Sequence, residues 1–275
     1  MIQIQNLKFN YRRKPQLFRD LHLTLEQGRL YGLLGKNGTG KSTLLKLIQG
    51  ALFSREGALN VKGSSASERR PGILSDIYFL TEDYELPSVR IKDYVSAYRP
   101  FYPRFDSARF DELVEIFEVP KGVRLNEISF GQKKKVLISF ALATGCQYLI
   151  MDEPTNGLDI PSKKQFRKAM LGGFKEDQVV IISTHQIRDL NQLLESVIII
   201  DQGKILFHKT VSEMEEKLSF EMDHTEHLDG SLYSERVAGG YLHLMPNAAG
   251  TPSEIDLEVL FNAVIEDQDK ITAHF

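Results

Sequence analysis

The sequence predicts an α/β fold in which a mixed β-sheet is combined with an antiparallel β part and a helical insertion. Short apolar runs that end in glycine or polar residues are typical of buried parallel strands, and they occupy residues 30–34, 77–80, 148–151 and 179–182. Alternating apolar residues at 2–11 and 21–25 predict antiparallel strands. Between residues 88 and 145 helical spacing dominates, which predicts the insertion.

The composition is that of an ordinary globular protein. Of the 275 residues, 42% are hydrophobic and 26% are charged, and the formal net charge is −3. This balance gives no excess of positive charge that would attract nucleic acid, so we expect no nucleic-acid partner. No apolar stretch reaches about 18 residues and the first residues do not begin a signal peptide, which predicts a cytoplasmic protein. The single cysteine, Cys146, lies in an apolar run and is interpreted as a buried side chain that fills space in the core.

The most informative stretch is glycine-rich and lies between the strand at 30–34 and a helix-prone segment at 42–48. It consists of Gly35, Lys36, Asn37, Gly38, Thr39, Gly40, Lys41, Ser42 and Thr43. This pattern between a strand and a helix is that of a P-loop. We expect its glycines to adopt left-handed backbone angles and its amides to surround a phosphate. Lys41 is expected to reach the β- and γ-phosphates of a nucleotide, and the Ser42 hydroxyl to bind Mg²⁺.

The segment after the P-loop helix predicts a strand, a loop and then helices. Residues 57–63 read as a short strand between turn glycines, whereas the polar and basic residues 64–72 predict an exposed loop. Pro100 and Pro103 divide the first part of the insertion into two helices.

A second group of motifs follows the insertion. Ser129, Gly131 and Gln132 precede three consecutive lysines at 133–135 and a helix that extends through residue 143. We interpret the lysines as a solvated helix face, because three charges that open a helix are a weak nucleic-acid signal.

Two predicted strands are followed by residues with side chains suited to catalysis or metal binding. The run at 148–151 is followed by Asp152 and Glu153, and an apolar strand that ends in Asp can place a carboxylate beside P-loop-bound Mg²⁺. The run at 179–184 is followed by His185.

The remaining sequence predicts a hairpin and a small appended part. Residues 197–207 form two apolar runs around a Gln-Gly turn, and 212–218 predict a short helix. Strands within 233–244, a turn at 247–252 and a helix at 255–265 predict an α/β extension. We therefore divide the chain into a domain at 1–215, with its helical insertion at 88–145, and an extension at 216–275.

Taken together, the motifs resemble those of the ATPase subunit of an ATP-binding cassette (ABC) transporter over residues 1–215. By this resemblance the fold is a P-loop NTPase of the ABC ATPase type, residues 35–43 are the Walker A motif, 148–153 the Walker B motif, 128–132 the signature motif and 156–159 the D-loop.

The resemblance also implies roles for individual residues. Glu153 would be the catalytic base, His185 the switch histidine that contacts the γ-phosphate, and Tyr11 the aromatic residue that stacks on adenine. An aromatic residue packed at a strand end is the alternative for Tyr11. Ser129 and Gly131 would face the γ-phosphate of ATP across a dimer.

Two residues depart from the family pattern. The signature motif usually reads Leu-Ser-Gly-Gly-Gln, and Phe130 replaces its first glycine. Glu82 stands where a glutamine normally follows the strand to contact Mg²⁺ and the permease, so we expect Glu82 to join Ser42 and Asp152 around the metal. The alternative is that Glu82 lies on a solvated loop and that Asp83 or Glu85 serves equally well.

The resemblance implies a mechanism and partners. Two subunits, identical or different, would close head-to-tail around two ATP molecules, and hydrolysis would reopen them and drive an integral-membrane permease. The chain would then lie on the cytoplasmic face of the membrane. Residues 102–106 and 256–261 look like those of bacterial exporters that pair with a separately encoded permease.

Two other functions compete with transport. A soluble ABC ATPase that acts on nucleic acid or ribosomes generally has two cassettes or a coiled-coil insertion, which this sequence lacks. A regulatory nucleotide-binding module without turnover would not need Glu153 and His185.

Overall fold

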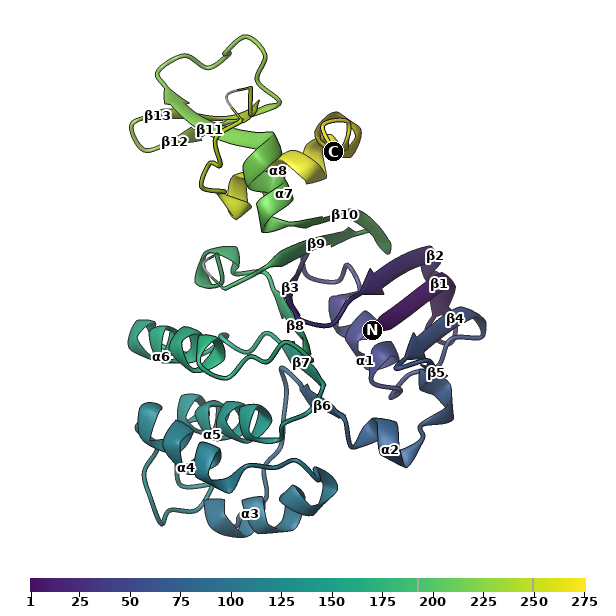
Figure 1. The fold of residues 1–275 in the computed structure, drawn as a ribbon, viewed down its shortest axis with the longest axis vertical. Coiled ribbons are helices and arrows are strands. Elements are labelled where there is room, and N and C mark those ends of the chain that lie inside the picture. Colours follow the sequence, from purple (N-terminus) through teal and green to yellow (C-terminus); the bar gives the residue numbers. More distant parts are fainter. Residues whose placement is uncertain (192, 249) are drawn as a thin grey trace.

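The structure is a computed structural model that describes residues 1–191, 193–248 and 250–275. Its main sheet has the strand order β10-β9-β3-β8-β7-β6 (Figure 1). The strands are β3 (Arg29–Leu34), β6 (Ile77–Leu80), β7 (Tyr148–Asp152), β8 (Val179–Thr184), β9 (Ser196–Asp201) and β10 (Lys204–Thr210). Neighbouring strands pair in parallel except β9 and β10, which form the predicted hairpin. The predicted α/β fold with a mixed sheet is confirmed.

The direction of the strands determines where the motifs meet. β3, β7 and β8 are neighbours that run the same way, so their carboxyl ends lie at one edge of the sheet. The P-loop follows β3, Asp152 ends β7, and His185 follows β8. These strands are almost entirely buried, which explains their continuous apolar sequences.

A second, antiparallel sheet has the order β2-β1-β4-β5 and consists of β1 (Ile2–Asn10), β2 (Gln16–Leu25), β4 (Glu56–Val61) and β5 (Ser64–Ser65). The P-loop helix α1 (Lys41–Ile48) buries its apolar residues in a core shared by both sheets. The expectation of an exposed loop at 64–72 is confirmed for the exposure of residues 67–72 but is wrong for the absence of regular structure. β5 pairs with β4, a 3-10 turn follows at Ala66–Glu68, and Pro71 begins the short helix α2 (Pro71–Leu74).

The helical insertion lies on the side of the main sheet away from the antiparallel sheet (Figure 1). Its helices are α3 (Ile91–Tyr98), α4 (Ser107–Ile116) and α5 (Phe130–Ala143), and α6 (Ile160–Leu171) packs beside them. The predicted break is confirmed, because α3 passes into a 3-10 turn at Arg99–Phe101 that contains Pro100.

The C-terminal extension lies at one end of the molecule (Figure 1). α7 (Val211–Lys217) spans its boundary at 215–216, and the extension contains β11 (Leu218–Asp223), β12 (Tyr233–Val237), β13 (Gly240–Pro246), α8 (Leu257–Glu266) and α9 (Gln268–Thr272). The strands form a sheet in the order β11-β13-β12. The predicted strands and helix are present, whereas β11 and α9 are additional. The turn expected at 247–252 includes Ala249, which lies outside the described residues.

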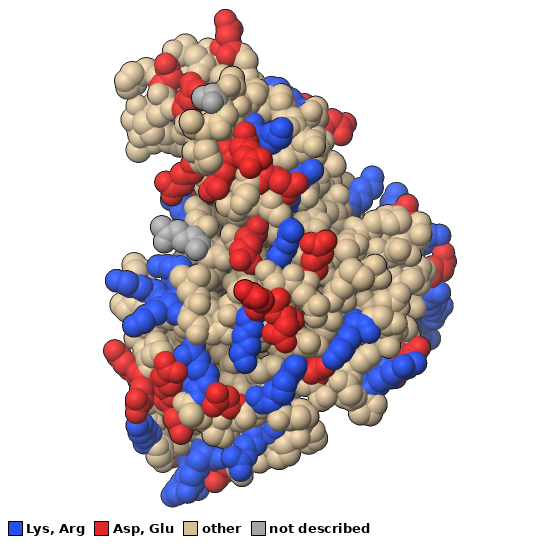
Figure 2. Space-filling view, in the orientation of Figure 1, with Lys and Arg blue, Asp and Glu red and all other residues tan. Residues whose placement is uncertain are grey.

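The surface carries charges of both signs. On the face shown in Figure 2, Asp and Glu side chains prevail on the C-terminal part at the top of the view, whereas Lys and Arg side chains are more frequent in the lower part. Within the described residues, none of the helices combines the length and apolar character needed to cross a membrane.

Candidate functional site

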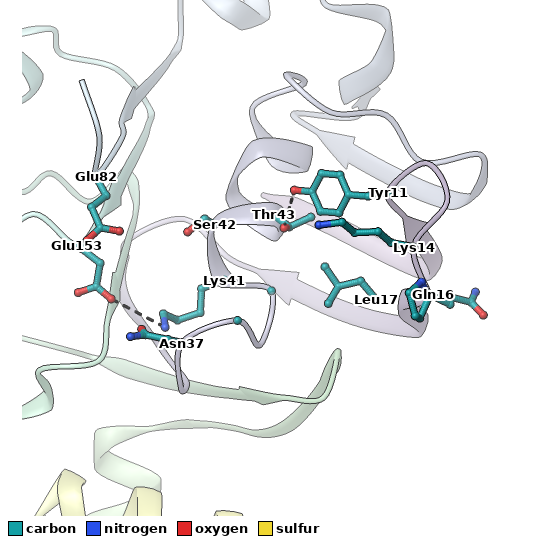
Figure 3. A pocket seen from close by; sticks show the side chains of 13 residues that line it. Tyr11, Lys14, Gln16, Leu17, Asn37, Lys41, Ser42, Thr43, Glu82 and Glu153 are labelled. Atoms are coloured by element: carbon teal, nitrogen blue, oxygen red, sulfur yellow. Dashed lines mark hydrogen bonds and ion pairs between the residues drawn. The ribbon is translucent and has the colours of Figure 1, made fainter. Parts of the chain in front are cut away.

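A pocket of about 590 Å³ opens over the P-loop (Figure 3). Its lining includes most of the predicted phosphate-binding residues, together with Tyr11 at one side and Glu82 and Glu153 at the other. The predicted residues that line it are Tyr11, Asn37, Gly38, Gly40, Lys41, Ser42, Thr43, Glu82 and Glu153. Sequence reasoning missed Lys14, Pro15, Gln16 and Leu17, which also line it. The pocket therefore extends from the P-loop along the segment that joins β1 to β2.

The P-loop glycines serve two different purposes. Gly38 and Gly40 have φ angles of 83° and 110°, as expected for left-handed turn positions. The same expectation is wrong for Gly35, which is outside the left-handed region. A Cβ atom on Gly35 would lie only 2.6 Å from the carbonyl oxygen of Ile200, so glycine is needed there because β9 passes close by. The Thr39 hydroxyl closes the loop by donating to the Lys36 carbonyl oxygen at 2.9 Å.

Lys41 begins α1 and extends back over the loop. Its side chain is only 7% exposed, and its Nζ atom donates to the carbonyl oxygens of Gly35 at 2.6 Å and Lys36 at 3.2 Å. Burial lowers the pKa of the Lys41 ammonium, and the carboxylate of Glu153, whose Oε1 atom lies 3.9 Å away, opposes that shift. The ammonium is thus held at the floor of the pocket beside an acidic group.

Glu153 lies just beyond β7 in a backbone conformation that is unusual for a non-glycine residue, with φ of 48°. Its amide donates to the Ser183 carbonyl oxygen at 3.1 Å, which ties the turn to β8. Its Oε1 atom lies 2.9 Å from His185 Nδ1, and its Oε2 atom accepts from the His185 amide at 3.4 Å. The structure therefore brings Lys41, Glu153 and His185 together, with Glu153 between the two basic side chains.

The predicted metal ligands come from three segments. Asp152 is 3% exposed, and the Ser183 hydroxyl, opposite it in the register of β7 and β8, donates to its Oδ1 atom. Among the described residues there is no group of three or more His, Cys, Asp or Glu side chains that could hold a metal unaided. Magnesium at nucleotide sites commonly uses one or two carboxylates together with phosphate oxygens, and the hydroxyl and carboxylate oxygens of Ser42 and Asp152 suit that arrangement.

Glu82 follows β6 and lines the pocket, whereas Asp83 and Glu85 are exposed and do not. Its Oε1 atom accepts a hydrogen bond from the side chain of Asn156, in the predicted D-loop, at 2.9 Å. This contact joins the segment after β6 to the segment after β7. The sequence alone left a choice among Glu82, Asp83 and Glu85. Of these three acids, Glu82 is the one that the structure brings to the pocket.

Tyr11 forms the opposite wall of the pocket. Its hydroxyl lies 2.9 Å from the Thr43 hydroxyl, and Lys14 Nζ is 6.0 Å from its ring centroid (Figure 3). Tyr11 as a whole remains 38% exposed. Tyr11 is therefore packed at the end of its strand, as one interpretation expects, and it is also exposed enough to contact a ligand, as the other expects. The basic run at 12–14, directly after a strand, was the sequence signal that could have pointed to Lys14.

Ser129, Gly131 and Gln132 do not line this pocket. They line a separate pocket of about 310 Å³ with residues of the D-loop. Ser129 also caps α5, because its hydroxyl accepts from the Gln132 amide at 3.2 Å while the Gln132 side chain accepts from the Ser129 amide at 3.1 Å. The signature residues of one chain are thus held at a helix start outside that chain's own P-loop pocket.

Phe130 makes one contact through its ring, which a glycine could not make, and one through its backbone. Its ring stacks on Tyr84 with centroids 5.3 Å apart and an interplanar angle of 12°, and the Tyr84 hydroxyl donates to the Phe130 carbonyl oxygen at 3.1 Å. The ring is still 52% exposed. The substitution therefore joins the signature motif to the segment that carries Glu82.

The interpretation of residues 133–135 as a solvated face is wrong for the middle lysine. Lys133 and Lys135 are partly exposed, but Lys134 is 0% exposed. It lies on the side of α5 that faces the turn after β7, and three consecutive helix positions cannot all face solvent when the helix packs on a sheet.

Comparisons with known proteins identify the family of the chain. The family model described as "ABC transporter" matches residues 18–156, about half of the chain. The "ABC transporter ATP-binding protein YtrB" of Bacillus subtilis (strain 168) is 27% identical over 203 residues, which cover 74% of this chain and 70% of the relative.

Solved structures support the same fold. The structure titled "ATP binding subunit of ABC transporter" has a TM-score of 0.69 and 21% identity, and the match covers 78% of this chain and 92% of that one. The dimeric post-hydrolysis state of the ATP-binding cassette MJ0796 with ADP and Pi has a TM-score of 0.68 and 20% identity, with coverage of 76% and 98%. By its matching model and the motifs gathered around the P-loop, the chain belongs to the ABC transporter family, as an ATP-hydrolysing subunit.

Proposed function

We propose that ATP binds in the P-loop pocket with its phosphates on the loop and its adenine against the exposed face of Tyr11. Lys41 then exchanges its bonds with the loop carbonyls for bonds with phosphate oxygens. Ser42 and Asp152 hold Mg²⁺, and Glu82 joins them around the metal. When bound, Mg²⁺ supplies neutralising charge to the phosphates. This ATPase domain comprises residues 1–215, and residues 216–275 form an extension to it.

Glu153 acts as the general base that orients and deprotonates the attacking water. The observation that supports this role most is the position of its carboxylate, which faces the P-loop lysine on one side and His185 on the other. An ionised carboxylate only accepts hydrogen bonds, so the Nδ1 atom of His185 donates to it. A His185 ring that carries hydrogen on both nitrogens fixes the base in this way and donates its Nε2–H to the γ-phosphate.

The separation of the signature motif from the P-loop pocket supports a dimer. Ser129 and Gly131 lie outside the pocket of their own chain, so they act on the nucleotide of a second subunit that packs head-to-tail. The Ser129 hydroxyl uses an oxygen lone pair for its cap, which leaves its hydrogen to donate to a phosphate. The solved cassette MJ0796 is itself described as a dimer with ADP and Pi. The partner is a second copy of this chain or a different ATPase subunit.

A membrane permease completes the proposed system. A groove of about 780 Å³ runs between α3, α4 and the loop that follows α4. On the same insertion Tyr98 and Phe101 are 43% and 66% exposed, an apolar surface suited to a protein partner. Docking there would hold the chain on the cytoplasmic face of the membrane and convert closure of the dimer into transport, with export as the favoured direction.

The test compares two single substitutions in the purified chain. Lys41→Ala should abolish ATP binding because the phosphates lose their buried cation, whereas Glu153→Gln should bind ATP normally and release almost no phosphate. Nucleotide titration and a phosphate-release assay measure the two properties separately. Hydrolysis by Glu153→Gln at a rate near that of the wild type would remove Glu153 from the role of base.

A further inference from the structure

The buried lysine of the signature helix has an unusual set of contacts. Lys134 is 0% exposed, and its Nζ atom donates to the backbone carbonyl oxygens of Glu153 at 2.8 Å and Asn156 at 3.2 Å. The same atom lies 5.7 Å from the centroid of the Phe130 ring. Both acceptors belong to the turn that follows β7. One cationic side chain on α5 therefore ties the two ends of the segment that begins with the proposed base.

Packing alone does not account for a cation at this place. Burial lowers the pKa of the Lys134 ammonium, while the carboxylates of Glu82, Glu153 and Asp152 oppose that shift. Within the described residues the ammonium forms no ion pair with any of these carboxylates, and its hydrogen bonds go to peptide oxygens. An apolar side chain of similar volume would avoid the cost of desolvating the charge, but it would remove the bond to the Asn156 carbonyl and leave the Glu153 carbonyl with only the Asn156 amide, which donates to it at 3.2 Å.

The turn needs such support because of its backbone. Glu153 has a φ of 48°, in the left-handed region that L-amino acids rarely adopt. On one side its amide is held by the Ser183 carbonyl oxygen, and on the other its own carbonyl oxygen is held by Lys134. Fixing both flanking peptide groups fixes the direction of the side chain between them. Asn156, at the far end of the turn, is also held through its amide side chain by Glu82.

We propose that Lys134 is a positioning residue for hydrolysis: it clamps the turn from Glu153 to Asn156 and so holds the Glu153 carboxylate at the attacking water. This inference rests on the proposed role of Glu153 as the base. It predicts that Lys134 matters for turnover and not for the binding of ATP, because its contacts are with the base's backbone and not with the P-loop. A displacement of the carboxylate by about 1 Å can slow a reaction roughly 100-fold.

The test uses Lys134→Met, which keeps the length of the side chain without its donors, and Lys134→Gln, whose amide can still donate. Lys133→Met is the matched control, because Lys133 is a partly exposed lysine one position earlier on α5. We expect kcat of Lys134→Met to fall roughly 10- to 100-fold, with ATP affinity and KM unchanged and with Lys134→Gln recovering part of the loss. Lys133→Met should match the wild type. Thermal unfolding and nucleotide titration confirm that each variant is folded.

A double substitution decides whether Lys134 acts through Glu153. In the Glu153→Gln background, Lys134→Met should not slow single-turnover phosphate release any further. A further loss there, or a parallel loss of ATP affinity and kcat in Lys134→Met alone, would show a general structural role and overturn the proposal. So would a kcat of Lys134→Met equal to that of Lys133→Met. If instead Glu153→Gln itself turns over normally, it is the assignment of the base that fails.

Discussion

Glu82 differs from the glutamine of the family pattern by its charge, and it lies in the pocket where we propose that Mg²⁺ binds. Its Oε1 atom already accepts from Asn156, and a glutamine could keep that bond, so the distinctive property of Glu82 is its charge. The pocket that it lines also receives Lys41 and Ser42. A carboxylate there should increase the attraction for Mg²⁺ and repel the phosphate that hydrolysis releases.

We therefore expect Glu82→Gln to shift the Mg²⁺ midpoint of ATPase activity upwards by a few-fold, which corresponds to roughly 1 kcal/mol or less for a water-mediated, partly exposed contact. The measurement is ATPase rate against Mg²⁺ at fixed ATP. Asp83→Asn is the matched control, since Asp83 is exposed and outside the pocket, and its midpoint should stay at that of the wild type. An unchanged midpoint in Glu82→Gln would take Glu82 out of the metal's surroundings.

Cys146 illustrates a residue whose role follows from burial. It is 1% exposed, and burial raises the pKa of its thiol to about 12. Because the thiolate is the reactive form, we expect the native protein to resist alkylation at neutral pH and to become labelled only after unfolding in denaturant. Mass spectrometry of samples treated with iodoacetamide measures this. Rapid labelling of the folded protein would contradict the assignment of Cys146 as a buried side chain that fills space in the core.

At the scale of elements, the strands and loops that can be predicted are those whose structure depends on a short local stretch of sequence. Strands β3, β7 and β8 are recognisable because both of their faces are buried, and the P-loop because its spacing is determined by phosphate geometry. The burial of Lys134 depends on a carbonyl 19 positions away in the chain, which no local pattern records. β11 is likewise hard to predict, since it is a partly exposed strand with only Leu218 fully buried.

The helix α8 connects the extension to the ATPase part. Leu260 is 0% exposed within the core that also contains Ile187 and Leu190, which lie shortly after His185. Arg188 on that segment bonds to Glu258 at the start of α8. The extension thus packs on the segment that follows the proposed switch histidine.

We expect Leu260→Ala to reduce the free energy of unfolding by about 2–5 kcal/mol, because it leaves a cavity at this junction. Urea denaturation measures the change. Met222→Ala provides the control, since Met222 is 63% exposed on β11 of the same extension and its loss should cost about 0.5 kcal/mol or less. Equal effects of the two substitutions would mean that α8 is not anchored in the main core.

At the scale of the whole molecule, the two parts of the proposed catalytic site lie in different places on one chain. The P-loop pocket contains Lys41 and Glu153, while Ser129 lines a second pocket beside the D-loop. If ATP joins these halves across two chains, a variant that binds ATP without hydrolysing it should remain closed. The dimer would then be held together mainly by nucleotide, so its mass should depend on ATP.

We expect Glu153→Gln with MgATP to sediment as a dimer, and the added substitution Ser129→Arg to return it to a monomer, because a long cation would fill the place of the partner's γ-phosphate. Analytical ultracentrifugation with and without ATP measures the mass. Ser129→Arg also removes the α5 cap, worth about 1 kcal/mol, so Ser129→Ala controls for that loss, and Ser67→Arg, at an exposed serine of the antiparallel sheet region, controls for added charge. Ser67→Arg should dimerise with ATP as fully as Glu153→Gln alone, and Ser129→Ala, which loses the cap and the phosphate contact but adds no bulk, should retain more of the dimer than Ser129→Arg. Two outcomes would show that the signature motif does not complete the site of a partner. One is a mass of Glu153→Gln that is the same with and without ATP, and the other is an ATP-bound dimer that still forms with Ser129→Arg.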